Sequence, residues 1–395
     1  MRLYRIFQRW FRRPKPMVLK PPCSSRRPLR MLVLEDRTVP NNYTATGPKD
    51  LIADINAANA AGGANTITLV AGMTFTLAVV NNATDGPNGL PVVQANDNLT
   101  IVGGGDTIRR KTSGGAPAFR LFDIESGASL SLENMTLEAG LTQTKGGAIL
   151  NAGTLTLHSV TIQNNSARGN DPPNQTNSFP IPGGTALGGG VASYGALTLD
   201  SCTIQNNAST GGTGGYGIAT GGGVVRGSGG GARGAGIYVG AGNVTIASSS
   251  ITGNTAQGGL GGTGGMAKGG GMCVENGTIA TTNTITLTSS AINGNLAKGG
   301  NGGTVGGNGL GGGLYVGRDF VGVGSTNITL HDLSIGGNTA AGGNKKTWTG
   351  QGIGGGIYID YGASVGLDSF TFSHVAGNHA STSDDDIAGS FSMIP

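Results

Sequence analysis

Apolar and polar residues alternate in short segments over much of the chain. Residues 154–157 read Thr-Leu-Thr-Leu, and the same alternation recurs at 196–199, 243–246 and 327–330. A period of two, built from Val, Ile, Leu and Thr, predicts β-strands that bury one face. Because no helical pattern separates these segments, we predict a coil of parallel strands rather than a β-α-β fold. Less regular strands are predicted at 66–69, 74–79, 99–102, 119–124 and 129–137.

Between residues 146 and 381 the chain repeats one unit six times. Each unit opens with a Gly-rich turn and apolar residues, and it closes with Ile-x-x-Asn, or with Val-x-x-Asn in the last unit. Successive closing asparagines are 42, 47, 41, 43 and 40 residues apart. A near-constant period of this length predicts a solenoid, in which stacked units share one core. The closing residues are Asn165, Asn207, Asn254, Asn295, Asn338 and Asn378.

We interpret the six closing asparagines as a structural ladder. Asn tolerates the left-handed backbone of a sharp corner, and its amide can hydrogen-bond to the Asn one coil away. Contacts to glycans or other ligands at these positions are the alternative interpretation.

We predict one coil per repeat rather than two. The inserts at 210–234, 257–270 and 298–312 are too Gly-rich to form well-packed strands, so we expect them to project together from one side as mobile loops. Like side chains of neighbouring coils would then stack at about 4.8 Å.

An Ala-rich segment precedes the strands. Residues 50–61 place Leu51, Ile52 and Ile55 on one side, and a Gly-Gly pair follows. The segment resembles the amphipathic helix that covers the N-terminal end of many β-helices. We therefore divide the chain into a basic, largely disordered leader at 1–40, a linker and capping helix at 41–64, and a parallel β-helix at 65–395.

The repeat resembles the units of right-handed parallel β-helix proteins. Gly-Gly followed by two apolar residues, and later an apolar residue before x-x-Asn, is similar to the repeats of polymorphic outer membrane proteins and autotransporter passenger domains. Those repeats usually carry Phe where this chain carries Ile or Val. The resemblance implies an all-β, right-handed parallel β-helix of the pectin lyase-like kind, with a short N-terminal capping helix and Gly-rich side loops. It also implies a structural or adhesin-like role at a cell surface.

Composition excludes collagen and argues against general disorder. Gly accounts for 77 of 395 residues, but no Gly-X-Y period runs through them and Pro accounts for only 15, so the chain is not a collagen. Apolar residues make up 37% of the chain, which provides enough material for a core.

The positive charge of the chain comes from its first 40 residues. They hold 11 of the 25 Lys and Arg residues but only two of the 21 acidic residues, although the whole chain has a net charge of +4. The remainder is therefore net acidic and offers no basic surface for nucleic acid. Residues 2–13 combine arginines with Leu3, Ile6, Phe7, Trp10 and Phe11 on one helical face. This pattern indicates transient contact with an anionic membrane, or a basic targeting arm without lasting structure.

A second motif follows in the leader. Residues 34–40 read Leu-Glu-Asp-Arg-Thr-Val-Pro, which resembles a leader motif of large planctomycete proteins thought to be exported. The resemblance implies an extracellular or outer-membrane-associated location. We accordingly expect cell-surface glycans or other surface proteins as partners.

Candidate catalytic residues are sparse in the repeats. His158 and Asp200 fall at one repeat position in neighbouring units, and His331 occupies that position three units beyond Asp200. A His beside a carboxylate could act as a general base, whereas an exposed bend carrying His and Asp is the structural alternative. No pair of carboxylates recurs at one repeat position, so a pectate-lyase-type polysaccharide lyase or hydrolase is our alternative to a non-catalytic module. We expect no metal ion and no cofactor.

Three tyrosines share another repeat position. Tyr238, Tyr315 and Tyr358 are flanked by inward-pointing apolar residues, so they should point outward, and Cys273 interrupts their row. An aligned aromatic row could stack on sugar rings or could shield the sheet. The spacing of the three cysteines of the chain implies no disulfide framework.

Overall fold

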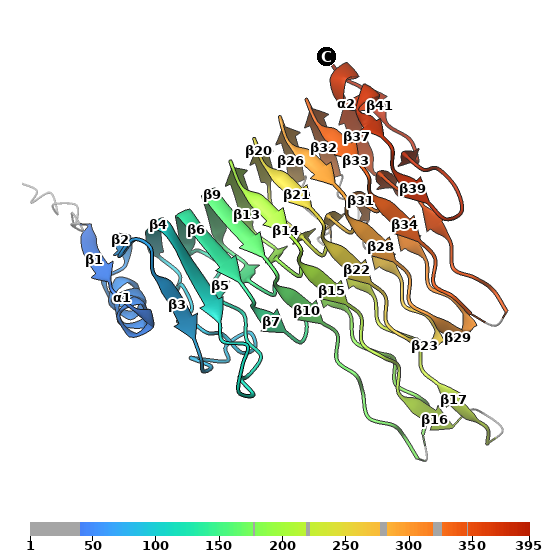
Figure 1. Cartoon of the computed structure of the whole chain (residues 1–395), viewed down its shortest axis with the longest axis horizontal. Helices are drawn as coiled ribbons and strands as arrows, with labels where there is room; N and C mark the ends of the chain where they lie inside the picture. Colours follow the sequence, from blue (N-terminus) through green and yellow to red (C-terminus); the bar gives the residue numbers. More distant parts are fainter. Residues whose placement is uncertain (1–39, 177, 219–221, 277–282, 319–325, 346) are drawn as a thin grey trace, which may run out of the picture. The chain divides into compact units, whose positions relative to one another are not determined.

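The computed structural model describes residues 40–176, 178–218, 222–276, 283–318, 326–345 and 347–395. Residues 1–39 lie outside the described residues, so the helix expected at 2–13 and the motif at 34–40, apart from Pro40, are not described. Within the described part, the chain winds into a parallel β-helix with short helices near its two ends (Figure 1). The predicted fold class is therefore confirmed. No described helix has the length and apolar character needed to cross a bilayer.

Four stacks of parallel strands form the walls of the β-helix, and we number them sheets 1 to 4. Sheet 1 contains β1 (Asn41–Ala45), β2 (Gly63–Leu69), β3 (Thr74–Leu77), β4 (Asp97–Arg110), β6 (Ser129–Glu138), β9 (Thr154–Gln163), β13 (Ala196–Asp200), β14 (Thr203–Gln205), β20 (Val244–Ala247), β21 (Ser250–Thr252), β26 (Asn283–Thr288), β27 (Ala291–Asn293), β32 (Thr326–His331), β33 (Ser334–Gly336), β37 (Ser364–Leu367), β38 (Val375–Ala376) and β41 (Ser392–Met393). Sheet 2 contains β5 (Phe122–Ile124), β8 (Ile149–Asn151), β12 (Val191–Ser193), β19 (Ile237–Val239), β25 (Met272–Asn276), β31 (Leu314–Arg318), β36 (Ile357–Ile359) and β40 (Ile387–Ala388).

The two remaining stacks flank the side loops. Sheet 3 contains β7 (Leu141–Thr142), β10 (Ser166–Arg168), β15 (Ala208–Thr210), β22 (Thr255–Gln257), β28 (Leu296–Lys298), β34 (Thr339–Ala341) and β39 (His379–Ala380). Sheet 4 contains β11 (Ala186–Leu187), β18 (Ala232–Arg233), β24 (Ala267–Lys268), β30 (Gly309–Leu310) and β35 (Gly352–Ile353). Further out, β16 (Tyr216–Ile218) pairs antiparallel with β17 (Val224–Arg226), and β23 (Gly261–Thr263) pairs parallel with β29 (Gly302–Val305).

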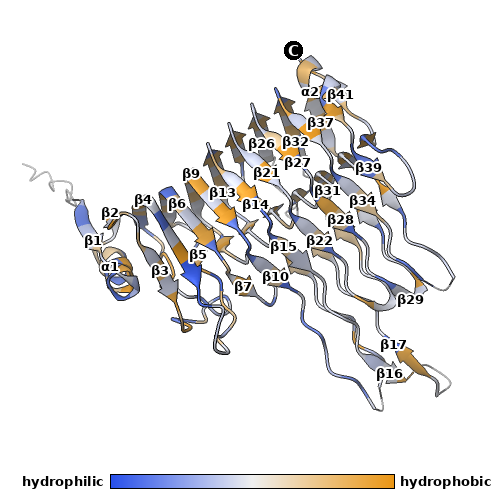
Figure 2. Cartoon of the chain, viewed as in Figure 1, coloured by the Kyte–Doolittle hydropathy of each residue, from blue (hydrophilic) through white to orange (hydrophobic). Residues whose placement is uncertain are grey.

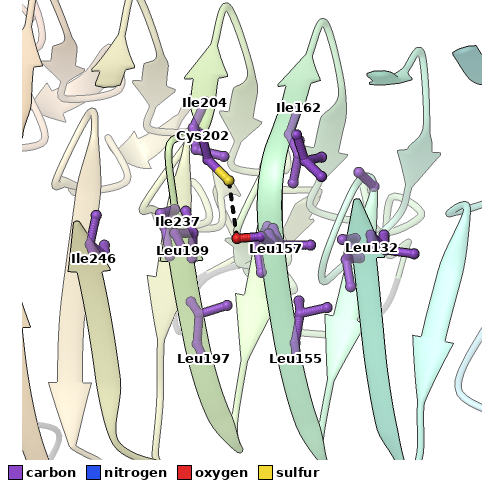
Figure 3. Close-up of a cluster of buried hydrophobic side chains, with 14 of the residues drawn as sticks. Leu132, Leu155, Leu157, Ile162, Leu197, Leu199, Cys202, Ile204, Ile237 and Ile246 are labelled. Carbon is purple, nitrogen blue, oxygen red and sulfur yellow. Dashed lines mark hydrogen bonds between the residues drawn. The ribbon is translucent and has the colours of Figure 1, made fainter. Parts of the chain in front are cut away.

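Each repeat forms one coil, as expected. Leu155 pairs directly with Leu197, and Leu197 pairs with Val244, so residues one repeat apart lie on neighbouring strands. The inward residues form one continuous apolar core from β2 to β37. Figure 3 shows this stacking, in which Leu155 and Leu157 lie beside Leu197 and Leu199.

Sheet 1 is bent along its length. In each of six coils one residue between the two halves of the strand adopts a left-handed conformation, because the chain must turn there while both halves keep pairing with the neighbouring coils. These residues are Asn134, Ser159, Ser201, Ser248, Ser289 and Asp332, with φ of 52°, 53°, 55°, 48°, 46° and 54°. We call this line of residues the bend.

The expected capping helix is present as α1 (Pro48–Ala61). It buries Leu51, Ile55 and Ala58 against the core, and Gly62 ends it with φ of 64°. The expectation of a linker before this helix is wrong, because residues 41–45 form β1, which pairs with β2 along its whole length. The chain therefore completes a strand before it covers the end of the core.

The Gly-rich inserts are closely packed. Their outgoing and returning limbs run side by side from sheets 3 and 4, toward β16 and β17 in the insert at 210–234 and toward β23 and β29 in the inserts at 257–270 and 298–312 (Figure 1). A zigzag of backbone hydrogen bonds joins the limbs of five successive coils: Gly184 N to Asn170 O, Gly212 N to Gly184 O, Gly230 N to Gly212 O, Gly259 N to Gly230 O, Gly265 N to Gly259 O, Gly300 N to Gly265 O, Gly307 N to Gly300 O, Gly343 N to Gly307 O and Gly350 N to Gly343 O, at 2.8–3.0 Å. We call this layer the glycine slab.

Glycine is required in the slab because neighbouring backbones touch. A Cβ atom on Gly259 would lie 2.0 Å from the carbonyl oxygen of Gly212, and one on Gly265 would lie 1.9 Å from that of Gly230. The expectation that these segments are too Gly-rich to pack well is wrong, because the limbs pack backbone against backbone. Such packing leaves no pattern of apolar side chains in the sequence.

Candidate functional site

The residues singled out as catalytic candidates lie directly before the bend in the sequence. Asp200 pairs with His158 on neighbouring strands, and His158 Nδ1 lies 2.9 Å from Asp200 Oδ2. Their side chains are 55% and 48% exposed. His331 lies further along the same row, where its Nδ1 is 4.0 Å from Asp368 Oδ2. The structure thus brings His158 and Asp200 together and places His331 in a separate His–Asp contact.

Hydrogen bonds hold the carboxylate of Asp368 next to the bend. It precedes α2 (Ser369–Ser373), accepts a hydrogen bond from Thr371 N at 2.8 Å, and accepts another from Asp332 N at 3.1 Å. Burial alone would raise the pKa of Asp368, but the hydrogen bonds from Thr371 and Asp332 and the charge of His331 outweigh it and lower the pKa. A carboxylate with a lowered pKa is a poor proton donor at neutral pH.

An open groove of about 640 Å³ runs along the bend between these two His–Asp contacts. Eight of its twelve lining residues are Ser or Thr, and Phe370 is the only aromatic residue among them. The lining residues are Ser201, Cys202, Thr203, Ser248, Ser249, Ser250, Ser289, Ser290, Ala291, Asp332, Ser334 and Phe370. We call this hollow the serine groove.

Two buried serines fix the floor of the serine groove. Ser249 Oγ accepts a hydrogen bond from Cys202 N, and Ser290 Oγ accepts one from Ser249 N, both at 3.0 Å. Each hydroxyl also donates to a carbonyl two residues earlier in its own coil. The position of Ser249 and Ser290, directly after the bend, is apolar in other coils, where Val160 and Leu333 occupy it. We did not identify this groove from the sequence, although Ser248–Ser249–Ser250 and Ser289–Ser290 fall at one repeat position and could have signalled it.

The three tyrosines lie on the outward face of sheet 2. Tyr315 and Tyr358 stack with ring centroids 5.4 Å apart and planes 3° apart, while Tyr238 contacts Tyr194 at 5.9 Å. Tyr238 and Tyr315 are only 4% and 1% exposed, and burial raises the pKa of both phenols well above the usual range. Of the three, only the half-buried Tyr358 keeps surface for a sugar ring.

Charged side chains cover the tyrosine row. Glu275 is fully buried and pairs with Arg233 and with Lys268, whose Nζ lies 2.7 Å from Glu275 Oε1. Lys268 Nζ also lies 4.5 Å from the centre of the Tyr315 ring. These ion pairs and the cation–π contact hold the charged side chains against the outward face of sheet 2.

The six closing asparagines lie buried at the corner between sheets 1 and 3. Each side-chain NH2 donates to the Oδ1 of the next asparagine at 2.9–3.0 Å, from Asn165 through Asn378. Each Oδ1 from Asn207 onward also accepts the backbone N–H of the preceding asparagine. The last NH2 donates to Asp386 Oδ1 at 2.9 Å, so a carboxylate ends the ladder. The sequence did not reveal this role of Asp386, because Asp386 lies outside the repeat.

Among the described residues, no group of three or more His, Cys, Asp or Glu side chains is placed to hold a metal ion. Cys202 and Cys273 are both buried. No protein-family model, curated protein or solved structure matches this chain, so its function must be argued from the geometry of the β-helix itself.

Proposed function

We propose that the chain is a non-catalytic, exported or cell-surface β-helix whose Gly-rich side loops contact a partner, as a structural or adhesin-like module. The supporting observation is the apolar surface of these loops. Eight of the 17 exposed large apolar side chains among the described residues lie there, including Phe179, Val224 and Trp348 at 68%, 76% and 70% exposure. Figure 2 marks β17 at the loop ends as hydrophobic. Exposed apolar patches of this kind are typical of interaction sites.

The glycine slab supports this proposal on energetic grounds. Because the backbone hydrogen bonds of the slab hold the limbs in place, a partner would meet a preformed surface and would not have to order the loops on binding. The resemblance of the repeats to autotransporter passenger repeats, and of residues 34–40 to an exported leader, favours surface glycans or surface proteins as partners. It also favours an extracellular or outer-membrane-associated location.

The second candidate is a polysaccharide lyase or hydrolase. The observation that favours it is the pair of His–Asp contacts at the bend, on either side of the serine groove. Against it, the contact between His158 and Asp200 is exposed, and the pKa of Asp368 is lowered rather than raised.

Two measurements test the proposed function. The chain is incubated with a panel of acidic polysaccharides, and new reducing ends and unsaturated products are assayed; we expect none. Product formation that His158→Ala abolishes would establish the enzyme instead. In parallel, binding of the labelled chain to cell envelopes is compared with that of Phe179→Ala/Trp348→Ala. The loop variant should bind less, whereas Tyr361→Ser, which changes a 98% exposed apolar residue outside the loops, should bind normally. Equal binding by all three proteins would contradict the proposal.

A further inference from the structure

The serine groove has the shape of a site for an extended chain. It crosses four coils, from Ser201 to Asp332, which at the strand spacing spans about 14 Å. The groove exists because the backbone turns through a left-handed residue at the same level in each coil. Its walls are therefore parallel to the axis of the β-helix, and a linear ligand could lie along it.

Hydroxyl groups of the groove repeat at the coil spacing. Ser201, Ser248 and Ser289 lie exposed at the bend on successive coils. Ser250 and Ser334, two residues after the bend in their coils, add further hydroxyls. A hydroxyl both donates and accepts hydrogen bonds, as the hydroxyls of a sugar do. A step of about 4.8 Å is also comparable with the length of one sugar unit in an extended polysaccharide.

Phe370 provides an apolar platform at the end of the groove. Its ring is 44% exposed and stacks on His374, with centroids 3.8 Å apart and planes 13° apart. Asp368 caps the short helix that carries Phe370, so the ring is held by packing on one face and by the helix cap. An aromatic face next to hydrogen-bonding groups is suited to the C–H face of a sugar ring.

The negative charge of the groove favours neutral polysaccharides over acidic ones. Asp332 lines it, Asp368 lies directly behind Asp332, and no Lys or Arg is among the lining residues. His158 and His331 each lie beside an aspartate, Asp200 and Asp368 respectively. A polyuronate or sulfated chain would therefore meet like charge at neutral pH.

We propose that the serine groove binds an extended, neutral polysaccharide across four coils, with one sugar ring against Phe370. The site is separate from the loop ends, so it adds a second binding surface to the proposed module. The floor serines already have their hydrogen bonds within the protein. Of the rim hydroxyls, that of Ser201 donates to Asp200 Oδ1 and keeps its lone pairs for the ligand, so Ser248, Ser250, Ser289 and Ser334 are the donors that we expect to contact the sugar.

The test titrates the full chain with neutral oligosaccharides of glucose, mannose and xylose, and with an oligouronate, by isothermal titration calorimetry. We expect one neutral series to bind. Phe370→Ala should weaken binding about tenfold, and Ser250→Ala/Ser334→Ala about fivefold, because one or two favourable contacts are lost. Alanine should be tolerated at these two positions, since Ala291 occupies the same row.

Matched controls separate the groove from the rest of the surface. Thr198→Ala/Thr245→Ala removes two exposed hydroxyls of sheet 1 that do not line the groove, and Phe179→Ala/Trp348→Ala changes the loop ends. Both should bind the neutral oligosaccharide as the unmodified chain does. The inference is overturned if no neutral oligosaccharide binds, if the oligouronate binds as tightly, or if neither groove variant weakens binding. Because Phe179→Ala/Trp348→Ala changes the loop ends and not the groove, its oligosaccharide binding tests the serine groove separately from the proposed loop partner.

Discussion

Adding one methyl group to the glycine slab should unfold part of it. In Gly259→Ala the new Cβ would lie 2.0 Å from Gly212 O and 2.8 Å from Gly230 N. Ordinary contact begins at about 3.4 Å, so the limbs would have to separate by more than an ångström. This separation strains or breaks the bonds from Gly259 N to Gly230 O and from Gly265 N to Gly259 O.

The magnitude follows from two contributions. Overpacking of a tight contact costs about 1–3 kcal/mol, and each lost backbone hydrogen bond costs about 1 kcal/mol. The free energy of unfolding should therefore fall by about 3–5 kcal/mol. Gly223→Ala is the matched control, because no atom lies within 4 Å of its Cβ position, and it should leave stability unchanged or raise it by up to about 1 kcal/mol.

Urea denaturation followed by circular dichroism measures the free energy difference, and hydrogen exchange shows where it arises. We expect peptides covering residues 211–218, 227–231 and 258–266 to lose amide protection in Gly259→Ala and to keep it in Gly223→Ala. If the two variants differ by less than about 1 kcal/mol, or if these peptides exchange rapidly in the unmodified chain, the loops are mobile and the slab does not hold.

Two further predictions concern the ladder and the bend. Asn254→Ala removes hydrogen bonds to Asn207, Asn295 and the carbonyl of Ile204 from a buried corner. It should therefore lower the free energy of unfolding, measured by urea denaturation, by about 3–4 kcal/mol. A loss below about 1 kcal/mol would contradict a structural role. Because the folded state lowers the pKa of Asp368, its ionised form stabilises the fold above the unfolded pKa of about 3.9, and this contribution disappears as the pH falls through the folded value. Asp368→Asn should therefore lower stability at pH 7 more than at pH 3, and an equal loss at both pH values would refute the assignment.

Side-chain periodicity made most of the β-helix predictable. Strands such as β9 and β13 alternate apolar and polar residues, and stacking them in register requires only that like residues recur at one period. The same reasoning located α1, whose apolar residues lie on one side. The glycine slab has no such signal, because its contacts are between backbone atoms.

The sites were harder to predict for a geometric reason. The serine groove depends on a left-handed residue between the halves of each strand, and a conformation of that kind in Ser248 or Ser289 is not evident from residue type. The burial of Tyr315 depends on Lys268, which reaches over it from the neighbouring sheet 4. Repeat position alone therefore indicated which side chains share a row and did not indicate what covers them.

The asparagine ladder has a direction that bears on how the chain can vary in length. Every internal unit offers an acceptor to the coil before it and a donor to the coil after it, so the units are chemically interchangeable. Only the ends differ: Gly140 N donates to Asn165 Oδ1 at the start, and Asp386 accepts from Asn378 at the finish. Whole units could be duplicated or deleted between these two termini without leaving an amide unmatched, so chains of different length could be built from the same two ends.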